Sequence, residues 1–308
     1  MQVIIVVGSL NMDLVIQAEN IPRPGETVLG YGFKQIPGGK GANQADAIAK
    51  LGAKVSMIGA VGEDSFGETL QESLRKDGVD VTYVLEKAGV ATGVAAIIVE
   101  KSGNNAITVA SGANFNLTEK DVESAENVLA EGDILLTQLE TPLDTVIYSL
   151  KKAKYMGMKT ILNPAPGRQL PEKVFTYTDV ITPNETELEL LTGMPVSTMD
   201  EIEKASKTLL DKGLQNVLVT LGSNGALHVD LEGAQHYKGH KVKAVDTTAA
   251  GDCFNGALAV GLSEGKDLKD SIKFAMAAAA LSVTRLGAQT SLPIRSEVDQ
   301  FMKEGMRS

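Results

Sequence analysis

Short apolar runs along the chain alternate with segments in which apolar residues recur at helical spacing. Val3 to Val7 is a continuous apolar run bounded by Gly8, which is typical of a strand buried on both faces. Positions 42, 45, 48 and 49 are then apolar, the spacing of one helix face. Further strands are expected at 55–61, 134–139, 160–162, 180–182 and 217–221, and further helices at 143–155, 185–191 and 201–210. Another helix is expected to run through Phe254, Leu258 and Leu262.

This alternation predicts an α/β fold with a three-layer, mostly parallel sheet covered by helices on both faces. No repeat or long linker divides the sequence, so we expect residues 1–308 to form a single domain. Residues 14–33 and 92–109 break the alternation, because short extended runs there flank glycine, proline and asparagine turns, as in hairpins. The pattern leaves open whether these hairpins are edge strands of the main sheet.

Composition narrows the function classes. The chain is 43% hydrophobic and 22% charged, which is ordinary for a soluble globular protein. Its net charge of −10 argues against a nucleic-acid or membrane surface, so bound phosphate would need local amides and a metal. The single cysteine, Cys253, allows no intrachain disulfide, and the sequence shows no leader and no long apolar run. We therefore expect a cytoplasmic protein.

The most informative chemistry lies at residues 245–256, where small residues precede a helix. Ala249, Ala250 and Gly251 leave their backbone amides accessible, and a helix start directs such donors at an anion. Asp252 would then lie beside that anion and could act as a base. This arrangement suits phosphoryl transfer. A simple helix cap by Asp246 or the threonines after it is the alternative interpretation.

Two earlier segments suit a polyhydroxylated ligand. Asn11 and Asp13 alternate along an extended segment, so both side chains point the same way and offer donors and acceptors. Gly39 and Gly41 would let a ligand approach the backbone, and Lys40 would add a hydrogen bond. A solvated strand end and an ordinary glycine-rich turn explain these two segments equally well.

Two further acidic positions follow predicted strands. Glu140 follows the strand at 134–139, and a carboxylate at the carboxyl edge of a parallel sheet usually faces a crevice. Asn184 and Glu187 lie one helical turn apart and could face one ligand. The same pair also fits a capping box, in which Asn184 begins a helix and Glu187 reaches back to it.

These segments together resemble the PfkB family of sugar kinases. Residues 245–256 are similar to its second signature, D-T-x-A-G-D or D-T-x-x-A-G-D, and residues 38–44 are similar to its first. Residues 8–13 are similar to the opening substrate motif of its ribose kinases. Segments 138–140, 163–166, 182–187 and 220–225 follow in the family's order, so the resemblance spans nearly the whole chain.

The resemblance implies ATP- and Mg²⁺-dependent phosphorylation of D-ribose at O5, with Asp252 as general base. It also implies that the hairpins, at about 12–35 and 90–112, form a β lid over the sugar and a homodimer contact. Met276 stands where many relatives have another residue in the adenine pocket, which leaves that contact open. The implied sugar ligands are Asn11, Met12, Asp13, Gly39, Lys40, Gly41, Ala42, Asn43, Glu140 and Asp252; the implied nucleotide ligands are Asn184, Thr220, Leu221, Gly222, Ser223, Asn224, Gly225, Gly251, Asp252 and Met276.

The same resemblance implies two cation positions. Glu187 is assigned to the Mg²⁺ shell, and K⁺ is assigned to a site beside the anion hole. Oxygen ligands alone suit a hard cation. The implied K⁺ ligands are the Asp246 carboxylate, the carbonyls of Thr248, Ser282, Arg285 and Gly287, and the Ser291 side chain.

The sequence excludes some other functional classes and leaves others open. The Rossmann G-x-G-x-x-G and the P-loop G-x-x-x-x-G-K-[ST] are both absent. His228, His236 and His240 lie near one predicted hairpin and are expected to be surface or strand residues. A related kinase acting on fructose, 2-keto-3-deoxygluconate or a nucleoside, and a non-catalytic sugar-binding protein, remain as alternatives.

Overall fold

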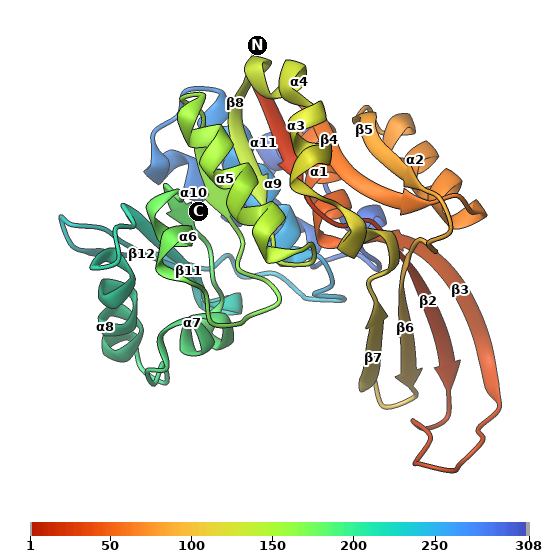
Figure 1. Ribbon diagram of the computed structural model, residues 1–308. Coiled ribbons are helices and arrows are strands. Elements are labelled where there is room, and N and C mark those ends of the chain that lie inside the picture. The colour runs from red at the N-terminus through yellow and green to blue at the C-terminus, as the bar shows by residue number, and fades with distance from the viewer. Residues whose placement is uncertain (1, 306–308) are drawn as a thin grey trace.

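A computed structural model describes residues 2–305 and shows a nine-stranded sheet at the centre of the molecule (Figure 1). The strands lie in the order β13-β12-β11-β10-β9-β8-β1-β4-β5. All neighbours from β11 to β5 are parallel, and β12 and β13 add an antiparallel edge. The bounds are β1 Val3–Val7, β4 Lys54–Gly62, β5 Asp80–Lys87, β8 Gly132–Thr137, β9 Lys159–Leu162, β10 Val180–Ile181, β11 Asn216–Thr220, β12 Gly225–Val229 and β13 Ala234–Lys238.

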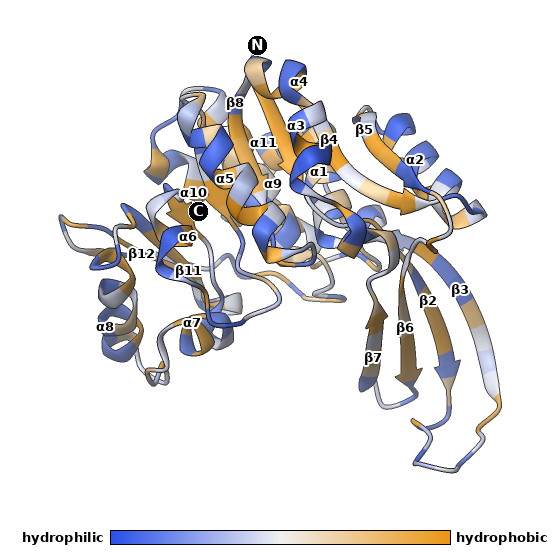
Figure 2. Ribbon diagram, in the orientation of Figure 1, coloured by the Kyte–Doolittle hydropathy of each residue, from blue (hydrophilic) through white to orange (hydrophobic). Residues whose placement is uncertain are grey.

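Helices cover both faces of this sheet, as the sequence predicts. In β1, Ile4 and Val6 pack into the core on one face, and Ile5 and Val7 pack into the core on the other. Figure 2 shows the resulting apolar strands between helices with polar outer surfaces. The first face carries α1 Lys40–Lys50, α2 Ser65–Lys76, α9 Ala250–Ser263, α10 Leu268–Ser282 and α11 Arg295–Gly305; the second carries α3 Glu119–Ser124, α4 Glu126–Glu131, α5 Leu143–Tyr155, α6 Glu172–Thr176, α7 Glu185–Thr192 and α8 Met199–Leu210.

The two expected hairpins form a second, four-stranded sheet that projects from the main body (Figure 1). The antiparallel pairs β2–β3 and β6–β7 join through a parallel pairing of β2 with β6. They are therefore not edge strands of the main sheet. The strands are β2 Asn11–Ala18, β3 Gly30–Gly38, β6 Gly93–Glu100 and β7 Asn105–Ala110.

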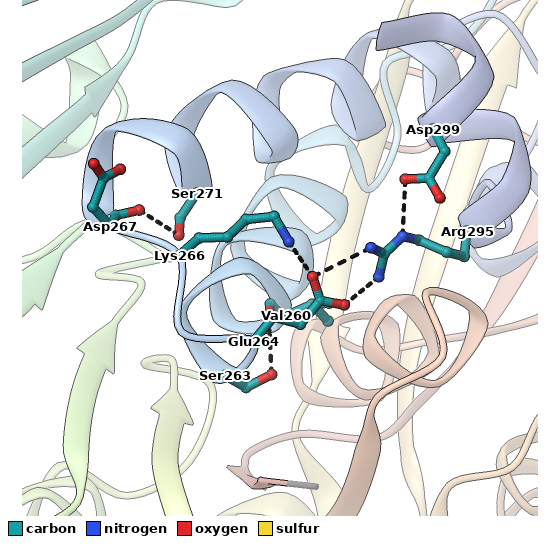
Figure 3. Close-up of polar contacts among 8 residues, drawn as sticks. All are labelled: Val260, Ser263, Glu264, Lys266, Asp267, Ser271, Arg295 and Asp299. Atoms are coloured by element: carbon teal, nitrogen blue, oxygen red, sulfur yellow. Dashed lines mark hydrogen bonds and ion pairs between the residues drawn. The ribbon is translucent and has the colours of Figure 1, made fainter. Parts of the chain in front are cut away.

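The far end of α9 is fastened by an ion-pair cluster (Figure 3). Glu264, just after α9, accepts from Lys266 and from the guanidinium of Arg295 at the start of α11. The Arg295 Nε also donates to Asp299 Oδ1 at 2.9 Å. These half-exposed pairs each contribute little energy, but together they tie α11 to the end of α9.

The first half of α9 packs closely on α1. Gly256 of α9 faces α1, and a methyl group in its place would lie 2.8 Å from the Ala47 Cβ and 2.9 Å from the Gln44 carbonyl oxygen. Small residues at this contact let the two helix backbones approach each other. None of the helices within residues 2–305 is both long and apolar enough to span a bilayer.

Candidate active site

The carboxyl ends of the central strands and the first turns of α1 and α9 meet at one edge of the main sheet. In parallel α/β sheets this edge is the usual place for a ligand. A cavity of about 220 Å³ opens there. It is lined by Lys40, Asn163, Ala165, Thr182, Asn184, Glu187, Thr220, Thr247, Ala249, Ala250, Gly251, Asp252 and Asn255.

Asp252 lies in the first turn of α9 and is only 6% exposed. Its two carboxylate oxygens accept from amides on α1: Oδ1 from Gln44 Nε2 at 2.9 Å, and Oδ2 from Asn43 Nδ2 at 3.0 Å. Burial raises the pKa of Asp252, and the Lys40 ammonium and the two amides partly oppose that rise. A buried carboxylate with raised proton affinity suits a general base.

Ala249 directly before α9 is the one non-glycine residue in the described range with a positive φ, 59°. This left-handed conformation costs an L-residue about 1 kcal/mol. Such outliers often serve a functional geometry. The Ala250 amide donates to the Thr247 carbonyl at 3.2 Å, which closes the turn. Ala249, Ala250 and Gly251 all line the cavity.

Lys40, the first residue of α1, is the cation at the centre of the site. Burial opposes its charge, but the carboxylates of Asp252, Glu140, Glu187 and Asp13 outweigh burial and raise the pKa of Lys40. The ammonium therefore stays protonated. It balances carboxylates that come from β2, α7, α9 and the segment after β8.

The polar residues expected to hold a sugar are fixed by neighbours that sequence reasoning missed. Asn114 Nδ2 donates to Asn11 Oδ1 at 2.8 Å, which leaves the Asn11 amide group as a donor for a ligand. Ser9 Oγ donates to Glu140 Oε2 at 2.5 Å, and the Lys40 amide donates to the same oxygen at 3.1 Å. Two residues thus orient the side chains that face the ligand.

The glycine-rich turn and the start of α1 come close to the backbone before β2. Gly39 has a φ of 93°, and a side chain there would lie 2.7 Å from the Asn11 amide nitrogen. A side chain on Gly41 would lie equally close to the Ser9 amide nitrogen, at 2.6 Å. Ala42 and Met12 are buried in the core beneath the site. The Oδ1 of Asn43 is buried without a hydrogen-bond partner, and Asn43 is not among the residues that line the cavity.

Asn184 and Glu187 form the capping box that was the alternative interpretation of this pair. Asn184 Oδ1 accepts from the Glu187 amide at 2.8 Å, and Glu187 Oε2 accepts from the Asn184 amide at 2.9 Å. Both residues nevertheless line the cavity. Burial raises the pKa of Glu187, and the Asn184 amide and the Lys40 charge oppose that rise. Capping and ligand contact are therefore compatible.

The expected nucleotide segment, residues 220–225, reaches the cavity at its first residue. Thr220 ends β11 and lines the cavity, and Gly222–Asn224 forms a 3₁₀ turn before Gly225. Leu221 is buried beneath that turn, and Ser223 and Asn224 are exposed on it. Met276 on α10 is 8% exposed, packs in the core and does not line the cavity.

The residues expected to bind a monovalent cation come from two segments that the structure brings together. Asp246 Oδ1 accepts from the Thr248 amide and Asp246 Oδ2 from the Gly287 amide, both at 2.9 Å. The Asp246 amide in turn donates to the Val283 carbonyl at 3.2 Å. The Arg285 guanidinium pairs with Glu297, and the hydroxyls of Ser282 and Ser291 donate to the carbonyls of Ala279 and Ala288.

The three histidines take no part in the site. His228 Nε2 contacts Asn216 Oδ1 at 2.9 Å, His236 contacts the Asn224 carbonyl, and His240 packs edge-on against Phe301. Within residues 2–305, no group of three or more His, Cys, Asp or Glu side chains is arranged to hold a metal ion.

Comparison with known proteins defines the class as sugar kinases. The model of the pfkB family carbohydrate kinases matches residues 1–295. The chain is 44% identical over 298 residues to a ribokinase from Haemophilus influenzae, which covers 97% of each chain. It is 40% identical over 300 residues to a deoxyribokinase from Salmonella typhi, which covers 97% of this chain and 98% of the relative. The chain belongs to the pfkB family of carbohydrate kinases.

Solved structures agree with this assignment. A ribokinase from Thermotoga maritima superposes with a TM-score of 0.90 at 42% identity and covers 98% of this chain and 100% of its own. A ribokinase from Arabidopsis thaliana, complexed with ribose and ATP, gives a TM-score of 0.92 at 35% identity and covers 98% of this chain and 99% of its own. The predicted fold class and family are thus confirmed.

The charge cluster predicts a pH-dependent stability change in Asp13→Asn. Burial, together with the charges of Glu140 and Asp252, raises the pKa of Asp13 from 3.8 to about 7. Because the folded protein then holds a proton that the unfolded chain has lost, stability falls as the pH rises from the unfolded pKa of 3.8 to the folded pKa of about 7, and the full loss is present above pH 7. The neutral amide should therefore raise the free energy of unfolding by about 1–2 kcal/mol at pH 8, after allowance for partial solvent screening, and by less at pH 5.

Urea denaturation at pH 5 and pH 8 measures this difference. Asp211→Asn, an exposed carboxylate at the end of α8, is the control and should change little at either pH. An equal gain at both pH values, or a loss of stability at pH 8, would contradict the prediction.

Proposed function

We propose that this kinase transfers the γ-phosphoryl group of ATP to O5 of D-ribose and releases D-ribose 5-phosphate. The observation that carries the proposal is the position of Asp252. Its buried carboxylate lines the same cavity as Lys40 and the small residues at the start of α9, and the charge of Lys40 also acts on Asp13 and Glu140. Relatives named ribokinase cover nearly the whole chain, and one solved relative holds ribose and ATP.

Each part of the site has a role in this reaction. Asp252 accepts the proton of the attacking hydroxyl, while the amides of Ala249 and Gly251 bind the charge that develops on the transferred group; the Ala250 amide is already bonded to the Thr247 carbonyl. Lys40 adds positive charge at the same place.

Mg²⁺ fits the site as an ion carried in by the nucleotide. It is commonly held by one or two carboxylates, phosphate oxygens and water. Glu187 lines the cavity and its Oε2 caps α7, so its other carboxylate oxygen would be the chain's contribution to the ion. When bound, Mg²⁺ neutralises phosphate charge. Asn184 and the Thr220 to Gly225 segment would hold the phosphates and the nucleoside.

The sugar would be held by Asn11, Asp13, Asn43 and Glu140. The Asn11 amide donor suits a sugar hydroxyl, and the Asp13 carboxyl and the free Asn43 Oδ1 supply acceptors. A second candidate substrate is 2-deoxy-D-ribose, because a relative of 40% identity is named deoxyribokinase.

An ATP-consumption panel with D-ribose, 2-deoxy-D-ribose, fructose and a nucleoside tests the proposal. We expect D-ribose to give the highest kcat/KM and product analysis to place the phosphate on O5. Asn11→Ala should narrow the preference for ribose over deoxyribose if the amide donor binds the 2-hydroxyl. If the enzyme phosphorylated fructose or a nucleoside and neither pentose, the proposal of a pentose substrate would be rejected, but the assignment as a kinase would stand.

We also propose a K⁺ site built on the Asp246 loop. Asp246 joins the segment before α9 to the 283–287 segment through Val283 and Gly287. Oxygen atoms of Thr248, Ser282, Arg285, Gly287 and Ser291 would complete it. A cation there would fix the turn that presents Ala249 and Gly251 to phosphate, so binding would favour catalysis without contacting the substrate.

K⁺ should raise the turnover rate, and Na⁺ should do so weakly or not at all. Asp246→Ala should remove the difference between the two ions. The measurement is kcat at constant ionic strength in K⁺, Na⁺ and a bulky organic cation. Equal rates in all three for the unaltered enzyme would reject the site and leave Asp246 as a local cap.

The small sheet is proposed to be a lid over the sugar and a homodimer contact. Val15, Ile97 and Ile107 are paired across three strands and point to the same face as Asp13. Ile107 is 55% exposed. An apolar row next to a ligand site would be covered both by the sugar beneath it and by the lid of a second copy.

Ile107→Glu should therefore shift a dimer toward monomer and raise the KM for ribose, since the carboxylate would have to be buried at the contact. Sedimentation velocity gives the oligomeric state. Leu231→Glu replaces another exposed apolar residue, 88% exposed between β12 and β13, and serves as the matched control. An unaltered chain that is monomeric at micromolar concentration would reject the dimer.

A further inference from the structure

Gln44 is a fully buried polar residue of α1 that faces the proposed base. It is 0% exposed and does not line the cavity. Its single amide nitrogen donates to Asp252 Oδ1 at 2.9 Å and to Asn163 Oδ1 at 3.2 Å. Both hydrogens of the amide are thus committed to protein acceptors, and neither is available to a substrate.

Gln138 fixes which way the Gln44 amide points. Its Nε2 donates to Gln44 Oε1 at 2.6 Å, so this oxygen is directed away from Asp252 and the nitrogen toward it. The reverse orientation would place Gln44 Oε1 against the Asp252 carboxylate and leave two acceptors in contact. The segment that follows β8 therefore sets the donor geometry at α9.

The chain of hydrogen-bonded polar side chains continues from Asn163 through the site. Asn163 Nδ2 donates to the Thr182 carbonyl at 3.3 Å, and the Thr182 hydroxyl donates to Asn255 Oδ1 at 2.6 Å. Asn255 Nδ2 then donates to the Gly251 carbonyl at 2.8 Å, next to the proposed anion hole. Buried networks of this kind hold a unique arrangement only when their members are paired.

We propose that Gln44 is the positioning residue of this kinase: oriented by Gln138, it holds the Asp252 carboxylate in the rotamer that meets the attacking hydroxyl. Asn43 fixes the other oxygen of the same carboxylate, but its own Oδ1 has no hydrogen-bond partner and the residue is also proposed to hold the sugar. Gln44 has no such second role. The assignment rests on the proposed function, because it needs Asp252 to be the base.

A double-mutant cycle tests the proposal with Gln44→Met, Asp252→Asn and the combination. Methionine keeps the volume and removes both donors. We expect Gln44→Met to lower kcat by about 10- to 100-fold, as misplacement of a reacting group does. Its dissociation constant for ribose should change by less than about twofold. Asp252→Asn should lower kcat by about 10²- to 10⁴-fold. In that background Gln44→Met should cost no more than about twofold further.

The pH profile gives a second readout that a loss of folding would not shift. Removing one of the two amide donors to the Asp252 carboxylate should move the acid limb of kcat upward by about one pH unit. Lys40 on α1, Asp13 on β2, Glu140 after β8 and Glu187 on α7 also face this site, and all four are retained in the variant. Gln138→Met, which leaves both donors but frees the amide, should give a smaller loss with the same direction.

The possible results distinguish the positioning role of Gln44 from the role of Asp252 as the base. Ser206→Ala, a buried hydroxyl on α8 that bonds only to the Ile202 carbonyl, is the control for a core polar change and should keep full activity. If Asp252→Asn is inactive while folded Gln44→Met retains full kcat, only the positioning role is overturned. An equal loss from Gln44→Met in both backgrounds, or an unshifted profile, overturns it as well. Near-normal turnover by Asp252→Asn would reject the base itself.

Discussion

A carboxylate at the start of one buried helix, held by two amides from another, is the contact on which the site depends. Asp252 on α9 is buried, and an ionised carboxylate there is stable only with donors. Asn43 and Gln44 supply them from α1. Those bonds require α1 and α9 to lie close together, and Gly256 permits that approach because it has no side chain. The hydrogen bonds to the Asp252 carboxylate therefore depend on the close packing of α1 and α9.

The same site carries an electrostatic cost. Asp13, Glu140, Glu187 and Asp252 surround the single ammonium of Lys40, and burial raises the pKa of Asp13 to about 7. Concentrating four carboxyl groups around one cation destabilises the free protein relative to a neutral site. Under the proposed function, the hydroxyls of a sugar and a metal-bound nucleotide would offset this cost. Function rather than stability therefore explains this cluster.

Local patterns in the sequence predicted most of the fold. β1 and α5 begin and end at the predicted residues, and other predicted elements differ by about two residues at an end. The capping box of Asn184 and Glu187 was also visible, because it needs only a three-residue spacing.

Contacts between distant segments were not visible in the sequence. Gln44 meets Asp252 across 208 residues, and Asn114 meets Asn11 across 103. No local spacing encodes such pairings, and the left-handed Ala249 also depends on its surroundings. The small sheet belongs to the same group, since the parallel pairing of β2 with β6 joins segments far apart in the chain. The paired start of these strands has a mechanical consequence. Asn11 pairs with Gly93, and a side chain on Gly93 would lie 2.3 Å from both Asn11 Oδ1 and Asn114 Nδ2. The end of the small sheet that joins the main body therefore carries Asn11, one of the residues proposed to hold the sugar. With eight residues in β2, the sheet is a lever about 26 Å long, so a rotation of a few degrees about Asn11 would displace its tip much further than Asn11 itself.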